Sequence, residues 1–447
     1  MLNLLQDWLD ATGAPGVSVA IDDGQTIRCF CAGMADVRTG AAVVEETAFQ
    51  LGSVSKSITA FLLVEALSDK EMKLDTPVVD IAPDLRASNE YAFHDTTVGH
   101  LLSHTSGLDS QWWVDMGQGA GARRAAARAI VSLPLIAPPG ELFSYSNSGY
   151  VLAGYLTEIL TGQRWEEFAE DRIARFLGSH SISARPDRIL IRPIAAGYAA
   201  PPDGGEARHT AHWYAPAALS PGGGLAGTPA DIARLMRLIR ARLMAPPLPI
   251  VPTVGWRYAG WGPGLARYRL GETSYCRGHD GTTAGQVCAV RLREDHPGTV
   301  VVAANAVWAA SQIGALAEDI LRATWGLADP PPLPQSDPLS GYAHWQLPAD
   351  TNLAGRYTRL NATMTITTAP DEIAVEELYS PQDAMNWFGV EAGGGTKPVR
   401  ERLRRTAPYS YASTGKELHF LRHPDDRARL YVHDGMRASV RTNRSWT

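Results

Sequence analysis

The sequence predicts a mixed α/β domain followed by a smaller all-β domain. Apolar residues alternate at Val17, Val19 and Ile21 before Asp22–Gly24, as in a strand that ends in a hairpin turn. An apolar run at 300–303 predicts a buried strand near the end of the same domain. Beyond a proline-rich segment, apolar residues alternate about turns, which is typical of an all-β domain.

Helices at both ends of the first domain are expected to cover a central sheet. Residues 1–10 have an amphipathic helical pattern, and apolar residues at helical spacing over 313–321 predict a second helix. These elements fit one discontinuous α/β unit, in which residues of about 75 to 240 supply an inserted helical part. Residues Thr228–Asp231 have the pattern of a capped helix start and predict one of the inserted helices.

Residues 329–338 predict a boundary between the two domains. Prolines are dense in this segment, so it is expected to be extended and stiff and to separate independent units. The predicted domains are therefore 1–328 and 339–447. In the second domain, pairs of alternating apolar residues predict a small antiparallel barrel: Met364 and Ile366, Ile373 and Val375, and Leu430 and Val432.

The composition indicates a soluble enzyme with a large core. The chain has 447 residues, of which 45% are hydrophobic and 20% charged, so two or more domains are expected. A net charge of -6 without a basic cluster on one helix does not favour a nucleic-acid partner. The N-terminus lacks a basic signal segment, and no apolar run has the length of a membrane span. We therefore expect a cytoplasmic protein that binds no membrane, and its oligomeric state stays open.

Neither a metal ion nor a cofactor is expected. The four cysteines are expected to be reduced thiols, as is usual in the cytosol. His209 and His212 are close in sequence, but no acid accompanies them at metalloprotease spacing. Residues 117–121 are rich in glycine, but they lack the Lys-Ser or Lys-Thr and the preceding strand of a phosphate-binding loop.

The most informative motif spans Ser53–Lys56 and places a hydroxyl and an amine one helical turn apart. Residues at i and i+3 share a helix face, so a helix that starts at Ser53 would point both side chains into one cleft. A buried helix N-terminus would also lower the lysine pKa, which lets the amine take the serine proton. The alternative is a surface lysine after a polar cap. Against it, lysine is rare in this chain, and a second Ser-x-x-Lys at Ser413–Lys416 contains a turn glycine and is assigned to a loop.

Two further motifs contain polar residues suited to catalysis. Tyr145 and Asn147 lie between a proline-marked turn and a predicted helix, where a tyrosine near an ammonium ionises more easily and an amide can bond a substrate carbonyl. His279–Thr282 precedes a predicted strand at 287–292, and its glycine would let a substrate backbone approach the strand edge. Each motif also fits an ordinary loop or a tight turn.

The three motifs occur in the order found in the serine β-lactamase and penicillin-binding-protein superfamily, which the chain resembles over residues of about 10 to 325. Segments 101–108 and 222–225 add to the resemblance, which is strongest to the class C-like branch of esterases, D-aminopeptidases, D-alanyl-D-alanine carboxypeptidases and peptide-cyclising thioesterases. The resemblance implies an antiparallel sheet, a helical subdomain and an acyl-enzyme mechanism. The second domain resembles the lipocalin-like domain of some of these hydrolases, where it would wall the cleft, bind an acyl chain or stabilise the protein.

The resemblance implies a role for each motif residue. Ser53 is similar to the family's nucleophile, Lys56 to its activating partner, and Tyr145 to its general base and acid. Asn147 is similar to a residue that orients the substrate. The backbone N–H groups of Ser53 and Thr282 would form the oxyanion hole.

The third motif departs from the β-lactamase pattern. Most β-lactamases have Lys-Thr-Gly where this chain has His279, Asp280 and Gly281, which with Thr282 are expected to bind the substrate. The family's lysine and threonine help to hold a carboxylate, whereas a histidine is a weaker cation and an aspartate repels a carboxylate. Slow hydrolysis of penicillins and cephalosporins is therefore expected. Asp280 would favour a substrate amine, unless strand alternation points it away from the cleft.

The expected function is that of a serine acyl-enzyme hydrolase that cleaves an amide or ester bond. Its substrate would be a small molecule or a short peptide, including a carrier-bound or thioester-activated one. The alternative within the same chemistry is an acyl or peptidyl transferase, in which an amine displaces Ser53. A third alternative is a non-catalytic binding module that is acylated once and stays trapped. The sequence lacks the Gly-x-Ser-x-Gly motif of an α/β-hydrolase.

Overall fold

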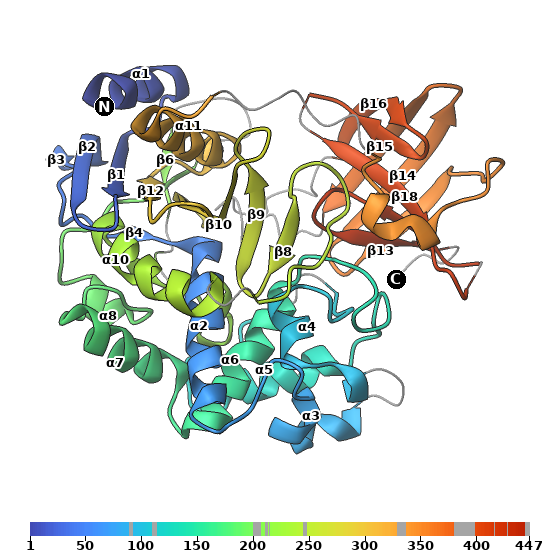
Figure 1. The fold of residues 1–447 in the computed structure, drawn as a ribbon, viewed down its shortest axis with the longest axis horizontal. Helices are drawn as coiled ribbons and strands as arrows, with labels where there is room; N and C mark the ends of the chain where they lie inside the picture. Colours follow the sequence, from blue (N-terminus) through green and yellow to red (C-terminus); the bar gives the residue numbers. More distant parts are fainter. Residues whose placement is uncertain are drawn as a thin grey trace.

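Figure 1 shows the computed structural model of the chain. It describes residues 1–88, 93–109, 114–199, 207–210, 213, 215–244, 248–328, 337–379, 398–414, 416–426 and 428–442. Most of the predicted linker, residues 329–336, lies outside the described residues, as does His212. No described helix combines the length and the hydropathy of a membrane-spanning segment.

The first domain contains an eight-stranded antiparallel sheet, as the resemblance implied. The predicted first strand is an interior strand of this sheet, where Val19 pairs with Val302. The predicted strands at 287–292 and 300–303 belong to the same sheet. In order across the sheet, the strands are β3 (Ala41–Ala42), β2 (Ile27–Asp36), β1 (Gly16–Asp22), β12 (Thr299–Ala304), β11 (Val287–Arg293), β10 (Tyr275–Thr282), β9 (Leu265–Arg269) and β8 (Gly260–Gly262).

Helices cover both faces of the sheet (Figure 1). Alternate residues of a strand point to opposite faces, so Val17 and Val19 pack against α1 and α11 while Ala20 faces α2 and α10. Thr228 caps α10 as predicted, but this helix packs directly on the sheet and is not part of the inserted helical layer. The bounds are α1 (Leu2–Thr12), α2 (Ser55–Ser68), α10 (Pro229–Ile239) and α11 (Ile313–Trp325).

Helices α6, α7 and α9 of the inserted part pack against α2, which is buried on almost all sides. The apolar residues Ile58, Phe61 and Leu62 are buried as predicted, and the polar start of the helix is buried too. The inserted helices are α3 (Val78–Ile81), α4 (Val98–Leu102), α5 (Ala122–Val131), α6 (Asn147–Thr161), α7 (Trp165–Leu177), α8 (Pro186–Ile189) and α9 (Ser220–Gly223). Two-residue strands pair β4 (Phe49–Gln50) with β7 (Ala226–Gly227) and β5 (Tyr198–Ala199) with β6 (Arg208–His209).

The second domain contains a closed eight-stranded barrel, which confirms the all-β prediction. Met364, Ile366, Ile373 and Val375 belong to its buried apolar core, as their alternation predicts. The strands follow one another in chain order, and β20 pairs with β13 to close the barrel. They are β13 (Gly355–Arg359), β14 (Ala362–Ala369), β15 (Glu372–Tyr379), β16 (Val399–Ala407), β17 (Ser410–Ala412), β18 (Glu417–Arg422), β19 (Leu430–His433) and β20 (Ala438–Thr442).

The hydrophobic core is continuous between the sheet domain and the barrel. Tyr431 and Ala438 of the barrel belong to the same buried cluster as Ile136 and Phe143 of the inserted part. The Tyr431 hydroxyl donates a hydrogen bond to Ile136 O at 2.8 Å. The barrel therefore packs against the segment that leads to Tyr145.

Candidate active site

Ser53 and Lys56 meet at the start of α2. Residues Gly52–Val54 form a 3-10 turn that continues into α2, so the two side chains keep the i, i+3 spacing although the α-helix itself begins at Ser55. Lys56 Nζ lies 3.0 Å from Ser53 Oγ. Ser53 is 8% exposed and Lys56 0% exposed. The predicted pair is therefore in hydrogen-bond contact in a site that excludes most water.

The surroundings of Lys56 favour its neutral amine. Burial lowers the pKa of Lys56 well below its ordinary value, and the positive charge of Arg437 lowers this pKa further. The amine donates to Gly222 O at 2.6 Å and lies 5.2 Å from the centre of the Tyr145 ring. A neutral amine in this position can accept the proton of Ser53.

The ring of Tyr145 lies near both Lys56 and a cation from the barrel. Burial raises the pKa of Tyr145, while a hydrogen bond with Ser53 and the charge of Arg437 act in the opposite direction. The phenol therefore keeps its proton near neutral pH. The Arg437 guanidinium lies 5.1 Å from the centre of the Tyr145 ring. The site thus has a proton acceptor and a proton donor beside Ser53.

Two separate parts of the chain hold the backbone around Tyr145. Ser144 N donates to His104 O at 2.8 Å, and Ser146 N donates to His104 Nδ1 at 3.0 Å. From the barrel, Met436 O accepts from Tyr145 N at 2.8 Å. His104 has a φ of 59°, a conformation that a non-glycine residue adopts at a cost in free energy. Neither His104 nor Met436 was predicted as a site residue.

His279 lies on β10, and its ring packs beside the rings of Tyr145 and Trp261. The ring centre is 5.9 Å from that of Tyr145 and 5.4 Å from that of Trp261. Nδ1 lies 2.7 Å from Asp280 O, which can only accept, so we assign the ring proton to Nδ1. Burial lowers the pKa of His279 to about 3. His279 is therefore neutral near pH 7 and is not the weak cation expected from the sequence.

The turn that contains Ser53 packs directly on β10, because both segments have glycine at the contact. A Cβ on Gly281 would collide with Leu51 O, and a Cβ on Gly52, whose φ is 50°, would lie 2.6 Å from Thr282 N. This contact brings the backbone of Thr282 beside that of Ser53. Among the described strands, β9 pairs only with the first half of β10, so the second half of this edge has no strand partner.

The structure does not bring Asp280 into this cluster. Alternate residues of β10 point to opposite faces, and Asp280 lies on the face that α11 covers. Its carboxylate accepts a hydrogen bond from Arg291 Nη1 at 2.6 Å, and Arg291 also binds Glu318 of α11 at 3.0 Å. The negative charge of Asp280 is therefore paired with Arg291 on the face away from Ser53, which weakens the repulsion of a carboxylate expected from the sequence.

Asn147 begins α6 and is buried next to Tyr145. The Ser146 side chain caps this helix by accepting a hydrogen bond from Gly149 N at 3.2 Å. Asn147 is 4% exposed, and its Nδ2 has no hydrogen-bond partner among the described residues. A buried amide donor without a partner costs free energy, so this group is suited to a substrate carbonyl.

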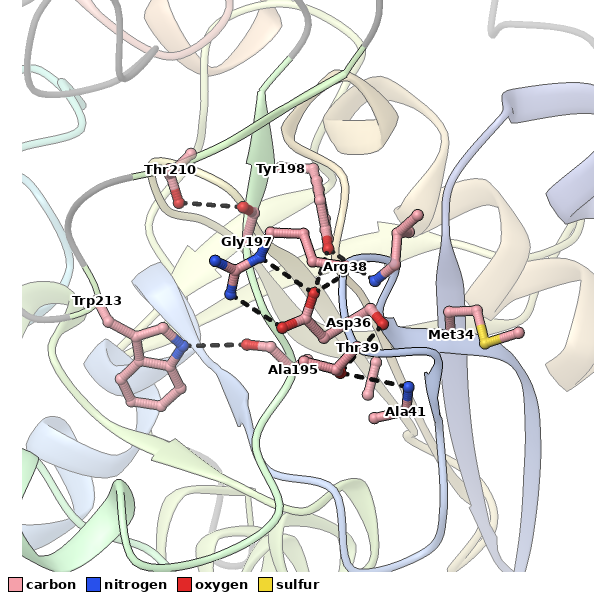
Figure 2. Close-up of polar contacts among 12 residues, drawn as sticks. Met34, Asp36, Arg38, Thr39, Ala41, Ala195, Gly197, Tyr198, Thr210 and Trp213 are labelled. Atoms are coloured by element: carbon pink, nitrogen blue, oxygen red, sulfur yellow. Dashed lines mark hydrogen bonds and ion pairs between the residues drawn. The ribbon is translucent and has the colours of Figure 1, made fainter.

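The segment between α8 and α9 is fastened to the hairpin of β2 and β3 (Figure 2). The Tyr198 hydroxyl donates to Asp36 Oδ1 at 3.0 Å, and Trp213 Nε1 donates to Ala195 O at 3.0 Å. Trp213 O in turn accepts a hydrogen bond from the Gln50 side chain of β4. These contacts hold Trp213 beside the strand that leads into the nucleophile turn.

Buried neutral histidines should make the stability of the protein depend on pH. Burial lowers the pKa of His104 well below its ordinary value, that of His279 to about 3 and that of His433 to about 4. The unfolded chain binds protons at these histidines below about pH 6.5 and the folded protein does not, so stability is complete above this pH and is lost as the pH falls toward the folded-state pKa values. Three such protons predict that the unfolding free energy falls by up to about 4 kcal/mol between pH 6 and pH 5.

Urea denaturation at several pH values measures this slope. His433→Gln removes one of the three groups and should reduce the slope by about a third. A stability that does not change between pH 7 and pH 5 would contradict the neutral state of the buried histidines.

Comparison with known proteins agrees with the geometry of the site. The Beta-lactamase family matches residues 3–324. Penicillin-binding protein 4 of Amycolatopsis lactamdurans is 30% identical over 309 residues, which are 65% of this chain and 80% of that protein. Esterase EstB of Burkholderia gladioli is 29% identical over 259 residues, which are 50% of this chain and 65% of the esterase.

A likeness over the whole chain comes from the solved structure of SurE with D-Leu. It has a TM-score of 0.73 and 24% identity, and it covers 99% of this chain and 98% of SurE, so the shared fold includes the barrel. The family match spans the sheet, the helical part and all three motifs. The chain therefore belongs to the β-lactamase family of serine hydrolases, together with penicillin-binding proteins, esterases and D-aminopeptidases.

Proposed function

We propose that the protein is an acyl-enzyme hydrolase in which Ser53 attacks an amide or ester bond of a small molecule or short peptide. The observation that supports this most is the 3.0 Å contact between Ser53 Oγ and the fully buried amine of Lys56. Relatives named as an esterase and as a D-aminopeptidase make esters and peptides the first substrates to test.

The pKa directions favour Lys56 as the first proton acceptor. Its neutral amine takes the proton of Ser53 as Oγ forms a bond to the substrate carbonyl carbon. The N–H groups of Ser53 and Thr282 then bind the carbonyl oxygen as it becomes negative. Tyr145 donates its proton to the leaving nitrogen or oxygen as the scissile bond breaks, and the proton on Lys56 returns to the Tyr145 oxygen. Asn147 Nδ2 donates to a second carbonyl of the substrate.

Deacylation uses the same groups in reverse. Water loses a proton to the same pair as it attacks the acyl carbon, and Ser53 Oγ leaves with a proton, which releases the acid. An amine in place of water would release an amide, and the protein would then act as a transferase. Both reactions require the same acyl-enzyme.

A panel of activated esters, D- and L-amino-acid amides, a chromogenic cephalosporin and peptidyl thioesters tests the proposal, with and without amine acceptors. We expect many turnovers per protein molecule on at least one ester or amide, with the free acid as the main product. An excess of amide product would favour the transferase. Release of only one equivalent of leaving group per protein molecule would contradict catalysis and favour a trapped binding module.

A further inference from the structure

We propose that Arg437, which the C-terminal barrel contributes, binds a carboxylate on the leaving part of the substrate. The preferred leaving group would then be an amino acid or peptide residue with a free C-terminal carboxylate. The proposal rests on the proposed function, because it requires Tyr145 to act at the leaving group. It gives the barrel a part in substrate selection.

The turn that presents Arg437 is fixed from inside the barrel. Asp434 Oδ1 accepts hydrogen bonds from Met436 N at 3.0 Å and from Arg437 N at 2.7 Å. Asp434 Oδ2 accepts from Arg359 Nη1 at 2.9 Å, and Arg359 also binds Glu377 at 3.1 Å. The charge of Asp434 is therefore engaged within the barrel by Arg359 and by the backbone of the turn.

The same turn is joined to the two residues that precede Tyr145. His433 Nε2 donates to Phe143 O at 2.8 Å, and Ala438 N donates to Ser144 Oγ at 3.1 Å. Arg437 lies between His433 and Ala438 in sequence, so both contacts set its position relative to Tyr145. A group that must recognise a substrate at the reacting bond needs this kind of fixed placement.

The guanidinium of Arg437 forms no hydrogen bond or ion pair with any described residue, and its Nε is buried. The charged and titratable groups that interact with it are Arg359, Asp434, Tyr145, Tyr379, Lys56, His104 and Tyr258. A partly buried cation without a direct partner costs free energy, which an anionic ligand would recover. A guanidinium matches a carboxylate with two parallel hydrogen bonds.

The position of Arg437 favours the leaving group over the acyl group. Its guanidinium lies 5.1 Å from the centre of the Tyr145 ring, and Tyr145 is the proposed proton donor to the leaving atom. A carboxylate on the carbon next to that atom comes within reach of Arg437. On β10, His279 is neutral and Asp280 is bound to Arg291, so this strand offers no cation that competes with Arg437.

Two thioesters of hippuric acid test the proposal, one with mercaptoacetate and one with mercaptoacetamide as the leaving thiol. In both, Ser53 Oγ displaces the thiol from the same carbonyl carbon, and only mercaptoacetate has a carboxylate. We expect the wild-type protein to show a kcat/KM roughly tenfold or more higher for the mercaptoacetate thioester. Arg437→Gln should bring this ratio close to one, mainly through KM, and Arg437→Lys should keep part of it.

Arg400→Gln is the matched control, because it removes an exposed barrel arginine that pairs with Glu376, and it should leave the ratio unchanged. A wild-type ratio near one overturns the proposal, as does an equal loss for both thioesters in Arg437→Gln. If Arg437→Gln does not fold, the kcat/KM ratios of the wild type and of Arg437→Lys still test the proposal. Failure of fluorophosphonate to label Ser53 would instead contradict the proposed function, and this proposal with it.

Discussion

Ser53→Ala should abolish covalent labelling by a fluorophosphonate and lower turnover of the best ester by a factor on the order of 10,000 or more. The substitution removes the oxygen that forms the acyl-enzyme, and no other group in the site can replace it. The fold should be retained, because the change removes one atom and Lys56 keeps its hydrogen bond to Gly222 O. Intact-protein mass spectrometry and circular dichroism measure the two effects.

The second Ser-x-x-Lys of the chain provides a matched control. The Ser413 hydroxyl donates to Glu401, and Lys416 Nζ pairs with Glu377, so this serine and lysine bind separate carboxylates in the barrel. The Ser413→Ala variant should be labelled by the fluorophosphonate to the same extent as the wild type. An adduct that persists in Ser53→Ala would show that another residue is the nucleophile.

The Ser53 and Lys56 contact could be predicted because it depends on local geometry. The two positions are three residues apart in sequence, and a 3-10 turn followed by an α-helix preserves this spacing. The barrel could also be predicted, because a strand with one buried face produces the alternation of apolar residues seen at Met364 and Ile366. Both predictions depend only on residues that are close together in the sequence.

Features that depend on contacts between distant segments could not be predicted in this way. The sequence contains a turn at Asp434, but only the packing of the barrel against the sheet domain places Arg437 over Tyr145. The face to which Asp280 points follows from strand alternation only once the position of α11 is known. The neutral state of His279 likewise depends on its burial, which no local pattern reveals.

Lys56→Met and Tyr145→Phe should each lower kcat by a factor on the order of 1,000 or more, and the double variant should lose little beyond the larger single loss. The two groups move one proton from Ser53 to the leaving atom, so removal of either one interrupts the whole transfer. Methionine should be tolerated in place of Lys56, because the buried amine is held neutral and the two side chains are similar in size. Lys70→Met, which changes an exposed lysine just beyond α2, should leave kcat unchanged.

The pH dependence of kcat distinguishes the two roles. Burial lowers the pKa of Lys56, and only the neutral amine accepts a proton, so the wild-type rate should fall as the pH decreases through this lowered pKa. Tyr145→Phe should keep this acid limb at a lower rate, because Lys56 still titrates. Lys56→Met should lose it. An acid limb that survives in Lys56→Met would show that the base is another group. Additive losses in the double variant would show that Lys56 and Tyr145 do not act on the same proton.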